Sequence, residues 1–205
     1  MGILYAGDRH RCFRPAGLID SSVDIVGTRT IHGAIFVEAS YQPNLIDQNV
    51  IFNTTGHGIY EHDSTNQTFA HNLIAHSSRC GLHLHGKITD RRVDRREMVY
   101  GRHTVHNNVL IAHARDNEYL GEPSDVSGNI ESNATAQLDL EQLTLAWTFP
   151  PAASRRPLPG ITNDLSDQPR DSQSTSAGSF DQLTGSLRIP WPLARETLPE
   201  FKRLP

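Results

Sequence analysis

The chain contains few of the residues that mark a secreted disulfide scaffold or a membrane protein. Its 205 residues include two cysteines, Cys12 and Cys80, which are too few for a disulfide framework. No apolar run approaches the roughly 18 residues of a membrane span, and the N-terminus lacks the apolar core of a secretory signal. The chain as it stands is therefore expected to be cytoplasmic, unless its true start lies upstream.

An excess of positive charge is also lacking. The formal net charge is −4, which excludes a general electrostatic affinity for nucleic acid. Neither nucleic acid nor a membrane is therefore expected as a partner. The length suits one domain with at most a small appended one.

An asparagine followed by an apolar pair recurs through the middle of the chain. Asn49, Asn72 and Asn108 each begin such a unit, a weaker copy begins at Asn129, and the steps are 23, 36 and 21 residues. Short alternating segments at this period predict an all-β fold, a right-handed parallel β-helix of about four turns. Asparagines stacked in register would hydrogen-bond one another along the coil. A β-sandwich with accidental internal similarity is the alternative.

Three parts are predicted along the chain. Residues 1–33 form an atypical or disrupted beginning, 34–133 the β-helix, and 134–205 a C-terminal extension of β-strands and Pro/Ser-rich loops. A β-helix has open ends that invite unwanted pairing, so the extension is expected to cap one end. The other end has no evident cap, so a homo-oligomer or a missing N-terminal region is expected to cover it.

Aligned strands of the repeat predict one face of the coil. Residues at the same position of successive strands form rows along the coil, and three such rows follow from the alignment. Side chains alternate between the faces of a strand, so the first row is expected to point inward and the other two outward. The rows are Ile35, Ile59 and Leu82; Phe36, Tyr60 and His83; and Glu38, His62 and His85.

Two acidic residues of this region have open interpretations. The same alternation turns Glu61 inward, so it either lies on a local bulge or is a buried acid with a partner. Asp63 follows at the strand end, where it could serve a site or cap a turn.

The stretch IFVEASYQPNLIDQNVIF resembles the acid/base segment of β-helical glycosidases of the β-xylosidase type, glycoside hydrolase family 120. In that family a glutamate ends an apolar strand and is followed by a short polar turn. The resemblance covers residues 34–190, which would make this chain the C-terminal portion of such an enzyme. The matching positions are Phe36, Val37, Glu38, Pro43, Leu45, Asp47 and Asn49.

The resemblance implies a retaining glycosidase that acts on an oligo- or polysaccharide without a metal or other cofactor. Glu38 would be the general acid/base. Asp20 and Asp24 are both candidates for the nucleophile, although neither has the family's offset to the glycine, and Asp20 is preferred. A retaining pair needs two carboxyl groups about 5–5.5 Å apart. The family's glutamine before Gly27 is missing, and Asp20 precedes Glu38 by 18 residues, less than one repeat. The expected substrate contacts are Phe36, Tyr60, His62, Asp63, His83 and His85.

Two other functions stay open. His62, His83 and His85, with Glu38 as a fourth ligand, could hold a transition metal, because neutral imidazoles suit zinc. A polysaccharide lyase or a non-catalytic carbohydrate-binding β-helix is the other alternative. A lyase needs positive charge near a uronate, for which the sequence offers Lys87, Arg91, Arg92, Arg95, Arg96 and Arg102.

Overall fold

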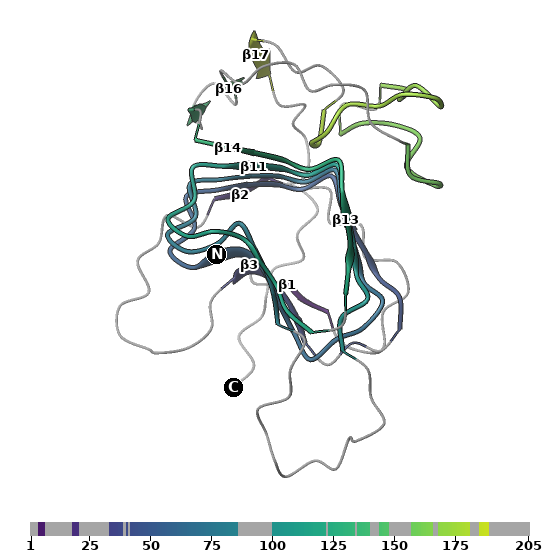
Figure 1. The fold of residues 1–205 in the computed structure, drawn as a ribbon. Coiled ribbons are helices and arrows are strands. Elements are labelled where there is room, and N and C mark those ends of the chain that lie inside the picture. Colours follow the sequence, from purple (N-terminus) through teal and green to yellow (C-terminus); the bar gives the residue numbers. More distant parts are fainter. Residues whose placement is uncertain are drawn as a thin grey trace, which may run out of the picture.

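The chain coils into a parallel β-helix of about four turns in the computed structural model (Figure 1). The structure describes residues 4–6, 18–20, 33–38, 40, 42–85, 100–121, 123–133, 135–139, 144–147, 157–165, 168–180 and 185–188. These ranges are all-β and contain no helix that could cross a bilayer. The right-handed parallel β-helix expected from the repeat is confirmed.

Three parallel sheets form the walls of the coil, and each complete turn contributes one strand to each. The first sheet has the order β1 (Leu4–Ala6), β3 (Gly33–Glu38), β6 (His57–His62), β9 (Leu82–His85) and β12 (Glu118–Tyr119). The second sheet has the order β4 (Leu45–Asp47), β7 (Thr68–Ala70), β10 (Thr104–His106) and β13 (Asp125–Ser127). The third sheet has the order β2 (Leu18–Asp20), β5 (Val50–Phe52), β8 (Leu73–Ala75), β11 (Val109–Ile111) and β14 (Ile130–Ser132).

The described N-terminal strands belong to the same coil. β1 pairs in parallel with β3, and β2 pairs in parallel with β5. The β-helix therefore begins before residue 34, where the sequence predicted its start.

An asparagine ladder ties consecutive turns together. Asn49 Nδ2 donates to Asn72 Oδ1 at 2.8 Å, and Asn72 Nδ2 donates to Asn108 Oδ1 at 2.9 Å. Asn108 Nδ2 continues the series to Asn129 Oδ1, also at 2.9 Å. Each of these acceptor oxygens also receives the backbone N–H of the preceding asparagine. The predicted bonding between stacked asparagines is confirmed.

A left-handed residue precedes each asparagine of the ladder. Gln48, His71, Asn107 and Gly128 have φ of 57°, 53°, 57° and 69°. A single residue in this conformation bends the chain sharply between a strand of the second sheet and a strand of the third. The bend recurs at the same repeat position in every turn, which keeps the turns in register.

Two apolar clusters hold the coil together. The first fills its interior and includes Ile35, Ile59 and Leu82, the row that was predicted to point inward. The second lies on the other face of the third sheet, where Val109 and its neighbours pack against Phe180 of the C-terminal extension. The third sheet is thus buried on both faces, which suits its apolar strands.

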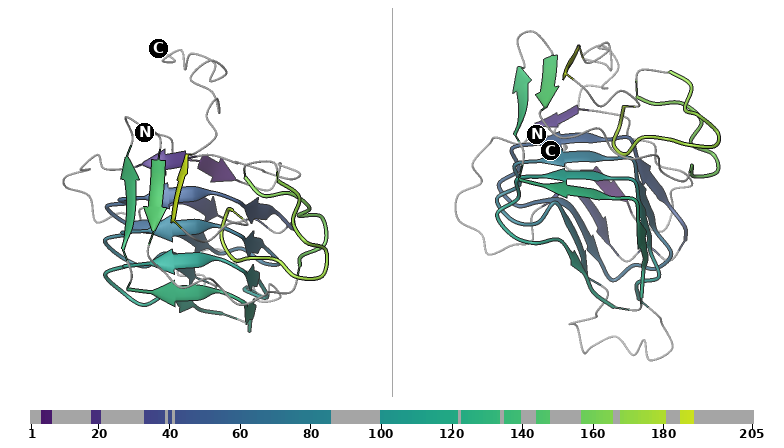
Figure 2. Two further views of the ribbon diagram at one scale, coloured as in Figure 1. Left: turned by 90° about the horizontal axis from the view of Figure 1, so that it is seen from above. Right: turned by 45° about the horizontal axis from the view of Figure 1, so that its top comes forward.

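The extension contains the predicted strand pair and last strand. β15 (Ala136–Asp139), β16 (Thr144–Trp147) and β17 (Gly185–Arg188) form an antiparallel sheet whose strands run across the stacked turns (Figure 2). Residues 157–165 and 168–180 lie along the side of the coil, where Ser179 Oγ donates to Asn49 O at 2.8 Å and Gly178 N donates to Asn107 O at 2.7 Å. A role of the extension as an end cap stays a prediction.

Candidate functional site

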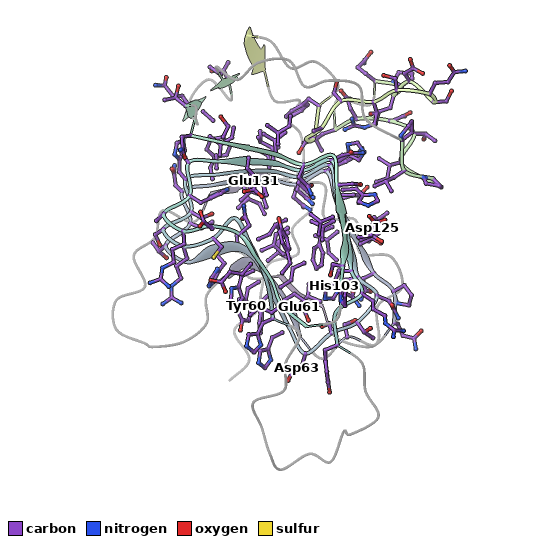
Figure 3. The ribbon with its side chains drawn as sticks, viewed as in Figure 1. Tyr60, Glu61, Asp63, His103, Asp125 and Glu131 are labelled. Atoms are coloured by element: carbon purple, nitrogen blue, oxygen red, sulfur yellow. The ribbon has the colours of Figure 1, made fainter. Side chains whose placement is uncertain are left out.

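The outer face of the first sheet carries the rings that the sequence singled out. Phe36 pairs with Tyr60 and Tyr60 with His83, while Glu38 pairs with His62 and His62 with His85. Both predicted columns are therefore in register along the axis of the coil. Figure 3 shows Tyr60 on the outer side of the sheet and Glu61 on the inner side, toward His103.

The rings of this face stack on one another. The centroid of Tyr60 lies 5.3 Å from that of Phe36 and 4.9 Å from that of His83, with an angle of only 6° to the latter ring. His62 and His85 stack in the same way, at 5.2 Å and 11°. Because its two column neighbours cover the faces of Tyr60, this buried ring offers neither face to a sugar. Phe36, His62, His83 and His85 stay partly exposed and remain candidates for ligand contact.

The structure does not bring Asp20 next to Glu38. Asp20 ends β2 in the third sheet, where it pairs with Phe52, whereas Glu38 ends β3 in the first sheet. The adjacency on neighbouring turns that a retaining pair would need is therefore not found. Asp24 lies outside the described residues, and the catalytic role of Glu38 stays a prediction.

Glu61 is a buried acid with a partner. β6 pairs continuously with its neighbours, Val37 and Leu84 flank Glu61, and no bulge interrupts this stretch. Glu61 Oε2 lies 3.4 Å from His103 Nε2, and both side chains are fully buried. The other oxygen, Oε1, accepts the backbone N–H of Ser64 at 2.5 Å. Of the two interpretations that the sequence left open, the structure supports the second.

Among the described residues, potential metal ligands form two groups beside this sheet. His62, Asp63 and His85 form the first group, and His57, Cys80 and His83 form the second. Within each group, one ligand atom from each residue lies within 4.8 Å of the other two. The predicted set of His62, His83 and His85 is thus divided, because His83 belongs with two residues that the sequence analysis did not single out.

The repeat explains how the second group is assembled. His57 and Cys80 each stand immediately before a glycine, and the N–H of Gly58 donates to Cys80 O at 3.1 Å. A Cβ on Gly58 would lie 2.3 Å from a side-chain carbon of Ile74, so the chain passes close to the core here. His57 itself lies beside the outer rings, 4.6 Å from His83 between centroids.

Burial controls the protonation of this group. It lowers the pKa of His57 to about 3, and the charges of His83, Arg79 and Arg115 act in the same direction. Burial also lowers the pKa of His83, although Glu118 opposes the shift. It raises the pKa of the Cys80 thiol. In the metal-free protein the two imidazoles are therefore neutral near pH 7, which is the form that binds metals.

Glu118 is a further residue of this face that sequence reasoning missed. Its Oε2 lies 3.0 Å from Nδ1 of His83, and the two residues pair in register between β12 and β9. His57 and Cys80 could have been found by extending the aligned strands one residue upstream, past Gly58 and Gly81. Glu118 has no counterpart in the earlier turns, so no pattern pointed to it.

The positive residues considered for a lyase are mostly outside the described part of the chain. Arg102 is described and is exposed, with a left-handed φ of 56°. The residues that lie outside the described ranges are Lys87, Arg91, Arg92, Arg95 and Arg96.

Comparisons with models of protein families, with curated proteins and with solved structures find no match for this chain. The class to which the chain can be assigned is therefore that of its fold, a parallel β-helix.

Proposed function

We propose that the protein is a carbohydrate-active β-helix that binds an oligosaccharide on the outer face of the first sheet. The observation that supports this most is the register of Glu38, His62 and His85 on three consecutive turns. Parallel strands repeat at about 4.8 Å, so the face offers hydrogen-bonding groups at regular steps along the coil. Such a face suits an extended chain of hydroxyl-bearing units.

The ring edges make the polar contacts in this proposal. Phe36 and His83 cover the faces of Tyr60, so imidazole nitrogens rather than aromatic faces meet the sugar. His62 and His85 stack on each other and are partly exposed, which leaves their edges accessible to hydroxyl groups.

Glycoside hydrolysis of the β-xylosidase type is the finer part of the proposal, with Glu38 as the general acid. Asp20 does not supply the second carboxyl group, because its strand belongs to the third sheet. Asp63 follows His62, the register partner of Glu38, and is the described carboxylate that we assign to this role.

Binding and hydrolysis are tested separately. Xylo-oligosaccharides and other neutral oligosaccharides are titrated against the protein by calorimetry, and aryl β-xylosides are assayed for release of the aryl group. Glu38→Gln should lower hydrolysis by about 10²–10⁴-fold and leave binding within a few-fold, because general acid catalysis contributes a factor of this size. Glu131→Gln, at an exposed carboxylate of the third sheet, is the matched control and should change neither.

Each result has a distinct meaning. Failure of all oligosaccharides to bind would exclude the proposed function. Binding without hydrolysis would leave a carbohydrate-binding module and remove the role of Glu38. Unsaturated products from uronate polymers would identify a lyase instead.

Metal binding at His62, Asp63 and His85 is a second candidate function. It is favoured by the distance of at most 4.8 Å between their ligand atoms and by the contact of 3.6 Å between His62 Nδ1 and Asp63 Oδ2. Two imidazoles and a carboxylate are a common donor set for catalytic zinc. Titration with Zn²⁺ should detect a site that is weakened at least tenfold in His85→Ala, and unchanged affinity would exclude this group.

A further inference from the structure

We infer that His57, Cys80 and His83 form a transition-metal site of one thiolate and two imidazoles, for which zinc is the expected metal. The three residues come from two consecutive turns of the first sheet, and their ligand atoms lie within 4.8 Å of one another. This site takes His83 from the column of Phe36, Tyr60 and His83, shares no residue with the proposed carbohydrate contacts at Glu38, His62 and His85, and goes beyond the proposed function.

The chemistry of the donors matches zinc. Thiolate sulfur and imidazole nitrogen are its preferred ligands, with bonds of about 2.3 Å and 2.0–2.1 Å. A tetrahedral site of these bond lengths holds its ligand atoms about 3.3–3.6 Å apart. Binding would therefore draw the atoms of this group together by up to about 1.5 Å, which side-chain rotation can provide. Three protein ligands leave the fourth position to a water or a substrate atom.

Burial gives the group a reason to bind a cation. His57 is 5% exposed, and within the described part of the chain its Nδ1 has no hydrogen-bond partner. A buried polar atom without a partner destabilises the fold, and a bond to a metal would satisfy it. The Cys80 side chain is completely buried beside it. A buried thiol is deprotonated outright when it coordinates a metal.

Glu118 is placed as the supporting carboxylate of this site. Metal-binding histidines commonly give their second ring nitrogen to a carboxylate, which orients the ring and raises its basicity. Glu118 Oε2 lies 3.0 Å from Nδ1 of His83, from the next turn of the same sheet. Its negative charge also offsets the positive charge that the metal brings near Arg79 and Arg115.

The test uses the full chain with two background substitutions. Cys12→Ser leaves Cys80 as the sole thiol, and His62→Ala removes the other group of ligands. In this background, titration with Co²⁺ should produce a thiolate-to-cobalt charge-transfer band. Zinc X-ray absorption should show one sulfur at about 2.3 Å and nitrogen at about 2.0–2.1 Å. Both measurements leave the proposed ligands unchanged, so they do not depend on the folding of a variant at those positions.

Variants then assign the ligands. Cys80→Ser should abolish the charge-transfer band, and His57→Ala should lower the affinity for Zn²⁺ at least tenfold. Glu118→Gln should lower it by about 10–100-fold, as loss of a supporting carboxylate does. Asp125→Asn is the control for Glu118, because Asp125 also contacts a histidine, His106, but lies in the second sheet. Cobalt binding without a thiolate band, or a zinc shell of nitrogen and oxygen alone, would overturn the inference.

Discussion

Glu61 and His103 meet inside the coil, where Nε2 of the imidazole lies 3.4 Å from the carboxylate and both side chains are excluded from solvent. Nδ1 of His103 accepts the backbone N–H of Gln67 at 3.2 Å. The proton of a neutral His103 therefore resides on Nε2, facing Glu61. The pair joins β6 to the turn before β10, so it links the first sheet to the second.

Replacing Glu61 by leucine should lower the free energy of unfolding by about 2–6 kcal/mol, because His103 Nε2 and the backbone N–H of Ser64 would each lose a buried acceptor, at about 1–3 kcal/mol each. Leucine fits sterically, since the neighbours of Glu61 in the row are Val37 and Leu84. Urea unfolding at pH 7 measures the loss. The double variant Glu61→Leu/His103→Leu should be less destabilised than the sum of the two single variants. If the loss of unfolding free energy in the double variant equals the sum of the two single losses, Glu61 and His103 do not stabilise each other.

An asparagine in the middle of the ladder should contribute more to the free energy of unfolding than one at its end. Asn72→Ala should destabilise by about 3 kcal/mol or more, because each buried polar group left without a partner contributes about 1–3 kcal/mol. The change would remove the acceptor of Asn49 Nδ2 and N–H, and the donor to Ile46 O. Thermal or urea unfolding gives the value.

Asn129→Ala is the matched control. This residue makes the same kinds of bond, to Asn108 and to Val105 O, but it is only partly buried. Water can therefore replace the lost partners, and the expected destabilisation is about half that of Asn72→Ala or less. An equal loss of unfolding free energy at the two positions would mean that burial does not determine how much each asparagine of the ladder stabilises the fold.

The fold could be predicted from the sequence because the repeat determines which residues stack. A period near 23 residues with an asparagine at one position carries over directly into the ladder of Asn49, Asn72 and Asn108. The two outward columns follow from the same alignment. The physical reason is that strand pairing between turns allows one register, and a shift by one residue would turn the apolar row outward.

The candidate site was predictable only in part. Asp20 was expected beside Glu38, but it occupies the repeat position of Phe52 and so falls on the third sheet. Which sheet a residue joins depends on the corners that precede it, and these are set by single left-handed residues such as Gln48 and His71. The four left-handed residues that precede the ladder asparagines are Gln48, His71, Asn107 and Gly128. Only the last is a glycine, so no simple sequence pattern marks these corners.

The partner of Glu61 was equally hidden from the sequence. His103 lies in the next turn, 42 residues further along the chain, and no local spacing connects the two residues. Their contact depends on how the first and second sheets meet inside the coil. Such a pair is found from coordinates and not from periodicity.

Stability should fall as the pH is lowered through the histidine range. Burial, reinforced by the charge of Arg170, lowers the pKa of His71 from 6.5 to about 3. Between these values the unfolded chain binds the proton and the folded chain does not, so acidification favours unfolding. The contribution of His71 is fully present above pH 6.5 and should decrease by about 2 kcal/mol at pH 5.

Urea unfolding of the wild type and of His71→Gln across this range tests the contribution. Between pH 7 and pH 5 the free energy of unfolding should decrease by about 2 kcal/mol less in the variant than in the wild type. Some dependence should remain, because burial also lowers the pKa of His57 to about 3 and that of His113 to about 4. If the free energy of unfolding changes equally with pH in the two proteins, His71 is not the group responsible.

Arg170 should control the docking of residues 157–180 on the side of the coil. Arg170 is 7% exposed, and its guanidinium donates to Gly178 O at 2.9 Å, and to Thr175 Oγ1 and Ser176 O at 3.2 Å each. These bonds fold the segment so that the N–H of Gly178 reaches Asn107 and Phe180 packs against the apolar face of the third sheet.

Arg170→Met keeps much of the apolar stem of the side chain but removes all of these donors. The carbonyls of Ser176 and Gly178 would lose the hydrogen bonds that the guanidinium donates, so the segment should detach before the coil unfolds. We expect at least a tenfold faster hydrogen exchange at Gly178 and faster proteolysis within 157–180, while the exchange of Ile59 in the core stays slow. Arg170→Lys should give an intermediate effect, because an ammonium group cannot reach several carbonyls with the planar geometry of a guanidinium. Unchanged exchange at Gly178 in Arg170→Met would show that the apolar contacts of Phe180 alone hold the segment in place.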